Sequence, residues 1–386
     1  MKREKTGTYT TTTVAGENVH AFVPNPLPPD PPIEWSLELV HKQEEAAMAL
    51  GRLDSMTSFL PEPSLFLYSY VRKEAVLSSQ IEGTQSSLSD LLVFENAESP
   101  GLPEKTDVVE VSNYVSAMEH GLKRLRGGFP LCLRLIREIH EILLSKGRGQ
   151  AKQPGIFRTS QNWIGGTRPG NAVYVPPPHS ALADCLDAFE KFLHDKKISV
   201  LEKAALAHVQ FETIHPFLDG NGRVGRLLIT LLMCWQGALN QPLLYLSLYF
   251  KKHRSMYYDL LQKARIDGDW EAWLAFFFEG VHATADEAVK TAKSLLSLYE
   301  KNRNRLLSKG RVASSILQVH HYFQISPLCS PNKIAQALKI SPATANKALD
   351  YLQQMKILRE ITGKQRDRLF SYQKYLQILN EGTEAS

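Results

Sequence analysis

The chain has 386 residues, of which 43% are hydrophobic and 22% are charged, and its formal net charge is +5. This ordinary globular composition provides enough residues for two or three domains around a large core. No stretch reaches the roughly 18 apolar residues of a membrane helix, and the first residues lack the apolar core of a signal peptide. The four cysteines are scattered without the spacings of a zinc site or disulfide framework, so we expect a reducing, cytoplasmic location and no membrane contact.

The chain begins with a polar segment followed by the proline-rich run Pro24–Pro32. We expect residues 1–35 to form an extended arm on the domain surface or a linker rather than a folded unit. From Ser36 onward the apolar residues recur at helical spacing, which predicts N-terminal helices over residues 36–100. The second of these helices should run from about Pro63 to Ile81.

Glu82 ends this second helix at a place where a negative charge is unfavourable. The C-terminal end of a helix dipole disfavours an anion by about a few tenths of a kcal/mol or more, unless a cation pairs with it. We therefore expect a positively charged partner for Glu82 elsewhere in the chain.

Residues 101–308 continue mainly as helices, with one stretch that has the signals of a β-hairpin. Two β-prone pieces, 162–165 and 172–175, flank the turn-forming run Arg168-Pro-Gly-Asn171. An exposed hairpin edge can pair with an extended peptide, although a plain surface hairpin is the alternative interpretation.

The most informative stretch is HPFLDGNGRVGR, from His215 to Arg226. A helix with a capping box precedes it and an almost wholly apolar helix follows it, so we predict a loop between two helices. Gly220 and Gly222 allow main-chain N–H groups to approach an anion, and the start of the next helix adds a positive dipole end. His208, seven residues before His215, is expected to be a core or supporting histidine rather than a metal ligand.

The side chains of this loop suit a nucleotide polyphosphate. Arg223 and Arg226 lie three residues apart on one helical face, where both can reach phosphate oxygens. Asp219 is the only carboxylate of the loop and is better placed to hold Mg²⁺ than to touch phosphate. His215 could take a proton from an incoming hydroxyl. The residues therefore predict transfer of a phosphorus group onto a hydroxyl.

HPFLDGNGRVGR resembles the signature of the Fic family, HPFx[DE]GN[GK]RxxR, at every fixed position. The resemblance implies a mainly α-helical fold with a Fic catalytic core over residues 101–308 and a β-hairpin flap. It also implies transfer of AMP from Mg-ATP to a Ser, Thr or Tyr hydroxyl of a target protein. In that reaction His215 would be the general base, Asp219 the Mg²⁺ ligand and Phe217 a core anchor for the loop.

The same resemblance implies an ATP site made by the loop, the next helix and one later tyrosine. Of the neighbours Tyr257 and Tyr258 we favour the second as a flat wall for adenine, although such pairs are more often core residues. The implied ATP-binding residues are Gly220, Asn221, Gly222, Arg223, Val224, Gly225, Arg226 and Tyr258.

Two earlier segments also resemble parts of this family. The run from Ser78 to Gly83 resembles the inhibitory motif [ST]xxxE[GN], which implies that Ser78 and Glu82 are inhibitory and that Glu82 pairs with Arg226. The predicted hairpin resembles the flap that aligns the target segment, with Ile164, Gly165 and Gly166 at its usual place. We therefore expect an autoinhibited protein adenylyltransferase.

Residues 309–386 have a character of their own. They hold 11 Lys and Arg against 5 Asp and Glu, whereas the whole chain carries only +5. Three predicted helices and two strands, with a tight turn at 339–341, resemble a winged helix-turn-helix domain. Its expected recognition helix contains one lysine and no arginine, so DNA binding and a role in dimerisation or partner docking both stay open.

Three alternative functions remain. The same site could remove AMP from a modified target, with Glu82 positioning water, or it could use a nucleotide other than ATP. The chain could instead be a DNA-binding regulator whose Fic domain senses ATP. The target protein, self-modification and a homodimeric state are not decided by the sequence.

Overall fold

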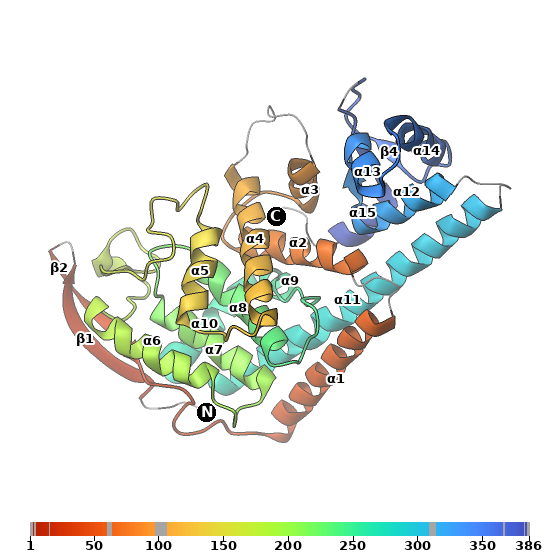
Figure 1. Cartoon of the computed structure of the whole chain (residues 1–386). Coiled ribbons are helices and arrows are strands. Elements are labelled where there is room, and N and C mark those ends of the chain that lie inside the picture. The colour runs from red at the N-terminus through yellow and green to blue at the C-terminus, as the bar shows by residue number, and fades with distance from the viewer. Residues whose placement is uncertain are drawn as a thin grey trace.

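The computed structural model describes residues 3, 5–14, 16–59, 64–96, 106–308, 314–365, 367–381 and 383. The protein is mainly helical, as predicted (Figure 1). The predicted helix starts at Pro63 and Ala313 lie outside the described residues. Before the C-terminal part the helices are α1 (Leu37–Phe59), α2 (Ser64–Ile81), α3 (Leu88–Asn96), α4 (Thr106–Arg126), α5 (Leu133–Leu143), α6 (His179–Leu193), α7 (Val200–Ile214), α8 (Asn221–Trp235), α9 (Ser247–Lys252), α10 (Arg254–Asp267) and α11 (Trp270–Leu307).

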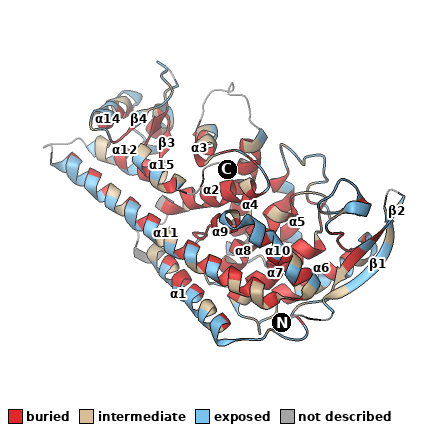
Figure 2. Ribbon diagram, turned by 180° about the vertical axis from the view of Figure 1, so that it is seen from behind, coloured by how far each residue is buried: buried red, intermediate tan, exposed pale blue. Residues whose placement is uncertain are grey.

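The core of the molecule surrounds α7 and α8, which are buried along almost their whole length. A helix that is buried on all sides needs neighbours on all sides, and here α2, α4, α5, α6, α10 and α11 provide them. Figure 2 shows buried residues dominating these central helices, whereas α11 becomes more exposed toward its C-terminal end. None of the described helices combines the length and the apolarity needed to cross a membrane.

The N-terminal segment differs from the expected extended arm. Strands β1 (Gly7–Val14) and β2 (Glu17–Pro24) pair antiparallel, with Gly7 opposite Pro24. The threonines and valines of this segment favour strands, and the prediction gave too much weight to the prolines that follow. The arm is therefore corrected to a hairpin over residues 7–24, while residues 25–36 contain neither helix nor strand.

The N-terminal hairpin packs against the segment in which the flap was expected. The main-chain N–H of Phe22 donates to the carbonyl of Val175 at 2.9 Å, and Glu17 pairs with Arg168 at 2.7 Å. Within the expected flap, one antiparallel bridge joins Ile164 and Tyr174, and a short 3-10 helix covers Pro169–Asn171. The two β-prone pieces therefore face each other as expected, but they pair only at this bridge.

The C-terminal part forms a module at the far end of α11 (Figure 1). Its antiparallel sheet has the strand order β3-β5-β4. The helix α15 at its end was not predicted. The elements are α12 (Ser314–Ile325), β3 (Leu328–Cys329), α13 (Pro331–Leu338), α14 (Pro342–Gln354), β4 (Arg359–Glu360), β5 (Phe370–Ser371) and α15 (Gln373–Asn380).

The end of this module returns to the N-terminal helices and packs against α2. The hydroxyls of Ser69 and Tyr375 are 2.7 Å apart in a buried hydrogen bond. Nζ of Lys73, a buried residue of α2, donates to the carbonyl of Glu381 at 3.0 Å. The side-chain amide of Gln80 donates to the carbonyl of Thr383 at 3.1 Å. The helix that ends beside Glu82 therefore contacts the last described residues of the chain.

Candidate active site

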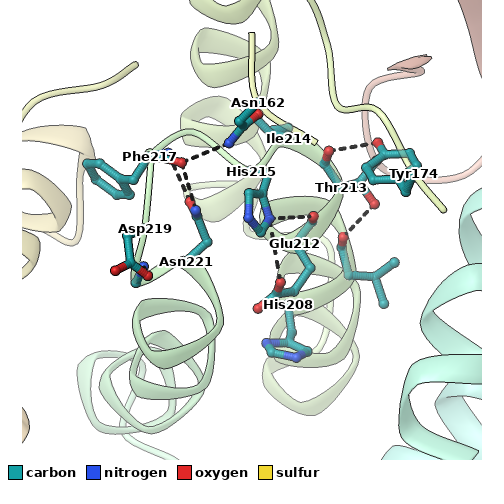
Figure 3. Close-up of polar contacts among 12 residues, drawn as sticks. Asn162, Tyr174, His208, Glu212, Thr213, Ile214, His215, Phe217, Asp219 and Asn221 are labelled. Atoms are coloured by element: carbon teal, nitrogen blue, oxygen red, sulfur yellow. Dashed lines mark hydrogen bonds and ion pairs between the residues drawn. The ribbon is translucent and has the colours of Figure 1, made fainter. Parts of the chain in front are cut away.

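The loop between α7 and α8 is closed by its own side chains (Figure 3). Oδ1 of Asn221 accepts a hydrogen bond from the N–H of Phe217 at 2.9 Å, and Nδ2 of Asn221 donates to the carbonyl of Phe217 at 2.8 Å. Phe217 is buried and stacks on His140, with ring centres 3.6 Å apart. Phe217 is thus the predicted core anchor, and the side chain of Asn221 has a structural role that the sequence analysis did not predict.

His215 ends α7 in a left-handed conformation, with φ of 50°. Its Nδ1 lies 3.4 Å from the carbonyl oxygen of Glu212, one turn earlier. Because a carbonyl can only accept a hydrogen bond, this contact favours a proton on Nδ1 and leaves Nε2 as an acceptor. Burial, together with the positive charge of Arg265, lowers the pKa of His215 to about 3. The imidazole is therefore neutral at pH 7 and can receive a proton.

Arg158 holds this end of α7 in place. Its Nε donates to the carbonyl of His215 at 2.9 Å, and its Nη2 donates to the carbonyl of Pro177 at 2.6 Å. Burial lowers the pKa of Arg158 to about 10, and the guanidinium still carries its charge at pH 7. A cation at a helix C-terminus is favourable because it faces the negative end of the dipole. The sequence analysis assigned no role to this residue, because nothing local marks it.

The segment expected to be the flap is fastened beside His215 at two further points. The amide of Asn162 donates to the carbonyl of Phe217 at 3.0 Å, and the hydroxyl of Tyr174 donates to the carbonyl of Thr213 at 2.8 Å (Figure 3). Gly165 and Gly166, next to Ile164, both have positive φ, which favours glycine there. The structure therefore brings the three predicted flap residues to the segment that borders the loop.

Glu82, Ser78 and Arg226 form a polar contact between the end of α2 and α8. Nη2 of Arg226 lies 2.6 Å from Oε1 of Glu82, and its Nε donates to Oγ of Ser78 at 2.9 Å. The Arg226 side chain is 2% exposed and that of Glu82 is 38% exposed, so water screens the pair from one side. Burial alone would raise the pKa of Glu82, but Arg226 outweighs it and the pKa is lowered. The predicted partner of Glu82 is present.

The Glu82 carboxylate lies over the first turn of α8. A Cβ added to Gly222 would collide with Oε1 of Glu82, so the absence of a side chain makes room for this oxygen. The first turn of a helix has unpaired N–H groups and a positive dipole end, which suit an anion. Glu82 therefore places its negative charge where a phosphate group would be favoured.

Arg223 has a different partner, which the sequence analysis did not identify. Its Nη1 lies 3.3 Å from Oε2 of Glu110 on α4, and both side chains are buried. Arg148 shares this carboxylate, with its Nε 2.7 Å from Oε1 of Glu110. Asp219 is 41% exposed and accepts a hydrogen bond from the N–H of Gly220 at 2.6 Å. One arginine of the pair is thus held by Glu82 and the other by Glu110.

Two motif residues pack inside the protein rather than at the loop. Val224 is a core residue whose N–H donates to the carbonyl of Gly220 at 3.0 Å. Gly225 faces α7, where a Cβ would lie 2.8 Å from Oε1 of Glu212. Both were predicted from the family resemblance to bind ATP, which stays a prediction; in this structure they also position α8 against its neighbours.

The two tyrosines of α10 have different surroundings. Tyr257 is buried and its hydroxyl lies 2.8 Å from Nε2 of His208, which stacks among the rings of Phe250 and Trp273. His208 is therefore a core histidine, as expected, and burial lowers its pKa to about 3. Tyr258 is 40% exposed, with the guanidinium of Arg254 over its ring. Of this pair, Tyr258 is the one that a ligand can reach.

A neutral histidine, a helix N-terminus and a buried arginine lie together between two core helices of a helical protein, an arrangement that suits an anion. Residues 40–123 match the Fic/DOC family N-terminal model, and residues 130–233 match the Fic/DOC family model. The chain belongs to the Fic family.

Relatives and a solved structure agree with this membership. The protein adenylyltransferase Fic of Aedes aegypti is 35% identical over 159 residues, which are 40% of this chain and 29% of that protein. The protein adenylyltransferase Fic of Drosophila virilis is 28% identical over 226 residues, which are 55% of this chain and 43% of that protein. The match thus spans less than half the length of these relatives. A Fic family protein from Desulfovibrio desulfuricans G20 has the same fold, with a TM-score of 0.57 and 19% identity over 88% of this chain and 97% of that one.

Proposed function

We propose that this protein is an adenylyltransferase that transfers AMP from Mg-ATP to a Ser, Thr or Tyr hydroxyl of a target protein, and that Glu82 inhibits it. The observation that carries the proposal is the neutral His215 near a helix N-terminus, where Arg226 already holds a carboxylate. Such a helix end, with an arginine, is a favourable site for phosphate. The names of the relatives support the same activity.

In the proposed reaction, the oxygen of the target hydroxyl attacks the α-phosphorus of ATP, and the bond from this phosphorus to pyrophosphate breaks. The hydroxyl proton moves to Nε2 of His215, the nitrogen left as acceptor by the contact of Nδ1 with Glu212. The products are a phosphodiester between AMP and the target side chain, and free pyrophosphate. The flap residues Ile164, Gly165 and Gly166 would align the target segment beside His215.

The first turns of α8 would hold the phosphates of ATP. Main-chain N–H groups from Gly220, Asn221 and Gly222 are the proposed cradle, and Arg223 and Arg226 are the proposed partners of the outer phosphates. Because Glu110 and Glu82 hold these two arginines, ATP would have to share or displace the carboxylates. Val224 and Gly225 would contribute by positioning this turn.

Asp219 and Tyr258 complete the proposed nucleotide site. Asp219 offers one half-exposed carboxylate next to the first turn of α8, and a single carboxylate with phosphate oxygens suits Mg²⁺. The described residues contain no cluster of three or more His, Cys, Asp or Glu that could hold a metal ion. When bound, Mg²⁺ would neutralise charge on the leaving pyrophosphate. The exposed ring of Tyr258 would form the wall for adenine.

The proposal is tested by incubating the Glu82→Gly protein with Mg-ATP and a cell lysate, and measuring intact masses. We expect an adenylyl increment on at least one polypeptide, and none with the Glu82→Gly/His215→Ala control. Competition of labelled ATP with GTP, CTP and UTP tests which nucleotide the site uses. If no polypeptide gains the increment, or if the double variant gives the same increment, the proposed function is wrong.

The reverse reaction is a second candidate, because the partly exposed Glu82 carboxylate lies close enough to influence the pKa of His215. A carboxylate in that place could position water for attack on an AMPylated side chain. Incubating wild-type protein with an AMPylated target and measuring released AMP distinguishes the two directions.

We also propose the predicted division of the chain, with an N-terminal segment (1–35), N-terminal helices (36–100), the Fic core (101–308) and a winged helix-turn-helix domain (309–386). The element order from α12 to β5 supports the last assignment. Salt-dependent binding to a duplex would identify a DNA-binding role, and a dimer that is lost on deletion of the domain would identify self-association. A cytoplasmic location remains part of the proposal.

A further inference from the structure

Glu212 lies on α7 one turn before His215, and its carboxylate faces the same imidazole (Figure 3). Its Oε2 is 3.9 Å from Nδ1 of His215, in addition to the 3.4 Å contact of its carbonyl oxygen with the same nitrogen. Its Oε1 is buried and has no hydrogen-bond partner among the described residues. A buried carboxylate oxygen without a hydrogen bond is costly, so its presence beside the proposed base requires a reason.

Gly225 provides the space for this carboxylate. It lies on α8 across from Glu212, and an added Cβ would be 2.8 Å from Oε1 of Glu212 and 3.3 Å from the ring of Phe211. A side chain at this position would therefore push the carboxylate or the helix away. This packing accounts for the last glycine of HPFLDGNGRVGR without any contact to a ligand.

Charged and titratable groups face Glu212 and His215 from every neighbouring element. Arg226 and Arg265 act on Glu212 as positive charges, and Glu82 acts on it as a negative charge. Burial raises the pKa of Glu212 to about 7, Arg226 opposes this shift, and Glu82 reinforces it. Removal of the Glu82 charge therefore favours the ionised form of Glu212. The groups that face the two residues are Glu82 directly after α2, His208 on α7, Arg226 on α8, Tyr257, Tyr258 and Arg265 on α10, and Arg158 before the expected flap.

We propose that Glu212 is a positioning residue for His215: it keeps the proton of the neutral imidazole on Nδ1 and stabilises the imidazolium that forms when Nε2 receives the hydroxyl proton. This inference rests on the proposed function. The transferred proton remains on Nε2 and the other proton remains on Nδ1 beside Glu212, so the carboxylate itself is not protonated in the step. A carboxylate that orients a catalytic histidine acts in this way in other enzymes.

The kinetic test compares Glu212→Gln with its parent, both in the Glu82→Gly background. Gln keeps the shape and removes the charge. We expect kcat to fall about 10-fold or more with little change in the KM for ATP. The rise of rate with pH that follows ionisation of Glu212 near pH 7 should disappear. Glu212→Asp should keep part of that rise, and Gly225→Ala should change the profile in the direction of Glu212→Gln. The matched control is Glu202→Gln, which removes a carboxylate from the first turn of α7. This variant should leave kcat and the dependence of the rate on pH unchanged.

A second measurement does not need transfer activity. Imidazole ¹⁵N shifts, assigned to His215 by comparison with His215→Ala, report which ring nitrogen carries the proton. In Glu212→Gln the population protonated on Nδ1 should fall, whereas Glu202→Gln should match the parent. An unchanged tautomer in folded Glu212→Gln, or an unchanged pH profile, overturns the role of Glu212. Absence of transfer in the parent protein would instead refute the proposed function, and the ¹⁵N shifts would still decide this inference.

Discussion

Replacement of Glu82 by glycine is the sharpest test of the proposed inhibition by this residue. The change removes the carboxylate that lies 2.6 Å from Nη2 of Arg226 and opens the space above Gly222. Arg226 keeps its hydrogen bonds to Oγ and the carbonyl of Ser78, so it should stay in place. The first turn of α8 and one guanidinium then become available to phosphate.

The size of the effect follows from the ion pair. Two unit charges about 4 Å apart attract by about 4 kcal/mol at an effective dielectric constant of about 20. Because the Glu82 side chain is 38% exposed, we reduce this value to about 1–2 kcal/mol. At about 1.4 kcal/mol for each factor of ten, transfer should rise roughly tenfold. ATP affinity should change less, because misplaced phosphates affect alignment for in-line attack more than binding.

The assay is incorporation of labelled AMP into protein by wild type, Glu82→Gly, Glu82→Gln and Glu82→Gly/Arg226→Ala. Glu82→Gln keeps the shape without the charge and should lie between wild type and Glu82→Gly. The double variant should be inactive, since the freed guanidinium is missing. A Glu82→Gly protein that is no faster than wild type refutes the inhibitory role, and a slower one favours the role of Glu82 in positioning water.

Three further predictions concern the base, the C-terminal module and acid stability. His215→Ala should lower transfer about 10²- to 10⁴-fold while ATP binding, measured by calorimetry, is largely retained; wild-type turnover would contradict the assignment. Deletion of residues 309–386 should keep transfer and raise the basal rate, because it removes contacts to α2 but no proposed catalytic residue; loss of activity in a folded truncated protein would show that the module completes the site. Glu271 has its pKa lowered to about 2, since hydrogen bonds from Arg3 and the N–H of Glu34 outweigh burial. Its contribution to stability should therefore be present above about pH 4.5 and be lost as the pH falls toward 2, so Glu271→Gln should flatten the acid side of the unfolding free energy; an unchanged slope would contradict this.

The loop at His215 could be predicted because its determinants are local. Proline, glycines and a following apolar run set the ends of α7 and α8 within a few residues. The partner of Glu82 was predicted only through the family resemblance, since 144 positions separate it from Arg226. Arg158 was not assigned for the same physical reason, because its partner His215 lies 57 positions away.

Other features were missed because composition gave a misleading or neutral signal. The proline run suggested an arm, although the threonine-rich residues before it form β1 and β2. Glu110 looked like an ordinary charge on α4, and only the folded structure buries it against Arg223. Glu212 likewise became recognisable once the position of Gly225 showed where its carboxylate lies.

The contact between α2 and residues 381 and 383 couples the C-terminal module to the helix that precedes Glu82. Lys73 and Gln80 of α2 bond the carbonyls of Glu381 and Thr383, and the same helix leads into Glu82. A ligand that binds the C-terminal module more tightly when Glu82 has left Arg226 favours that form, and by linkage it must strengthen any nucleotide binding that prefers the same form. The dependence is reciprocal, so nucleotide must change the affinity of that ligand by the same factor. The coupling between the two sites can therefore be measured from either side, as a change in nucleotide affinity or as a change in the affinity of the C-terminal ligand.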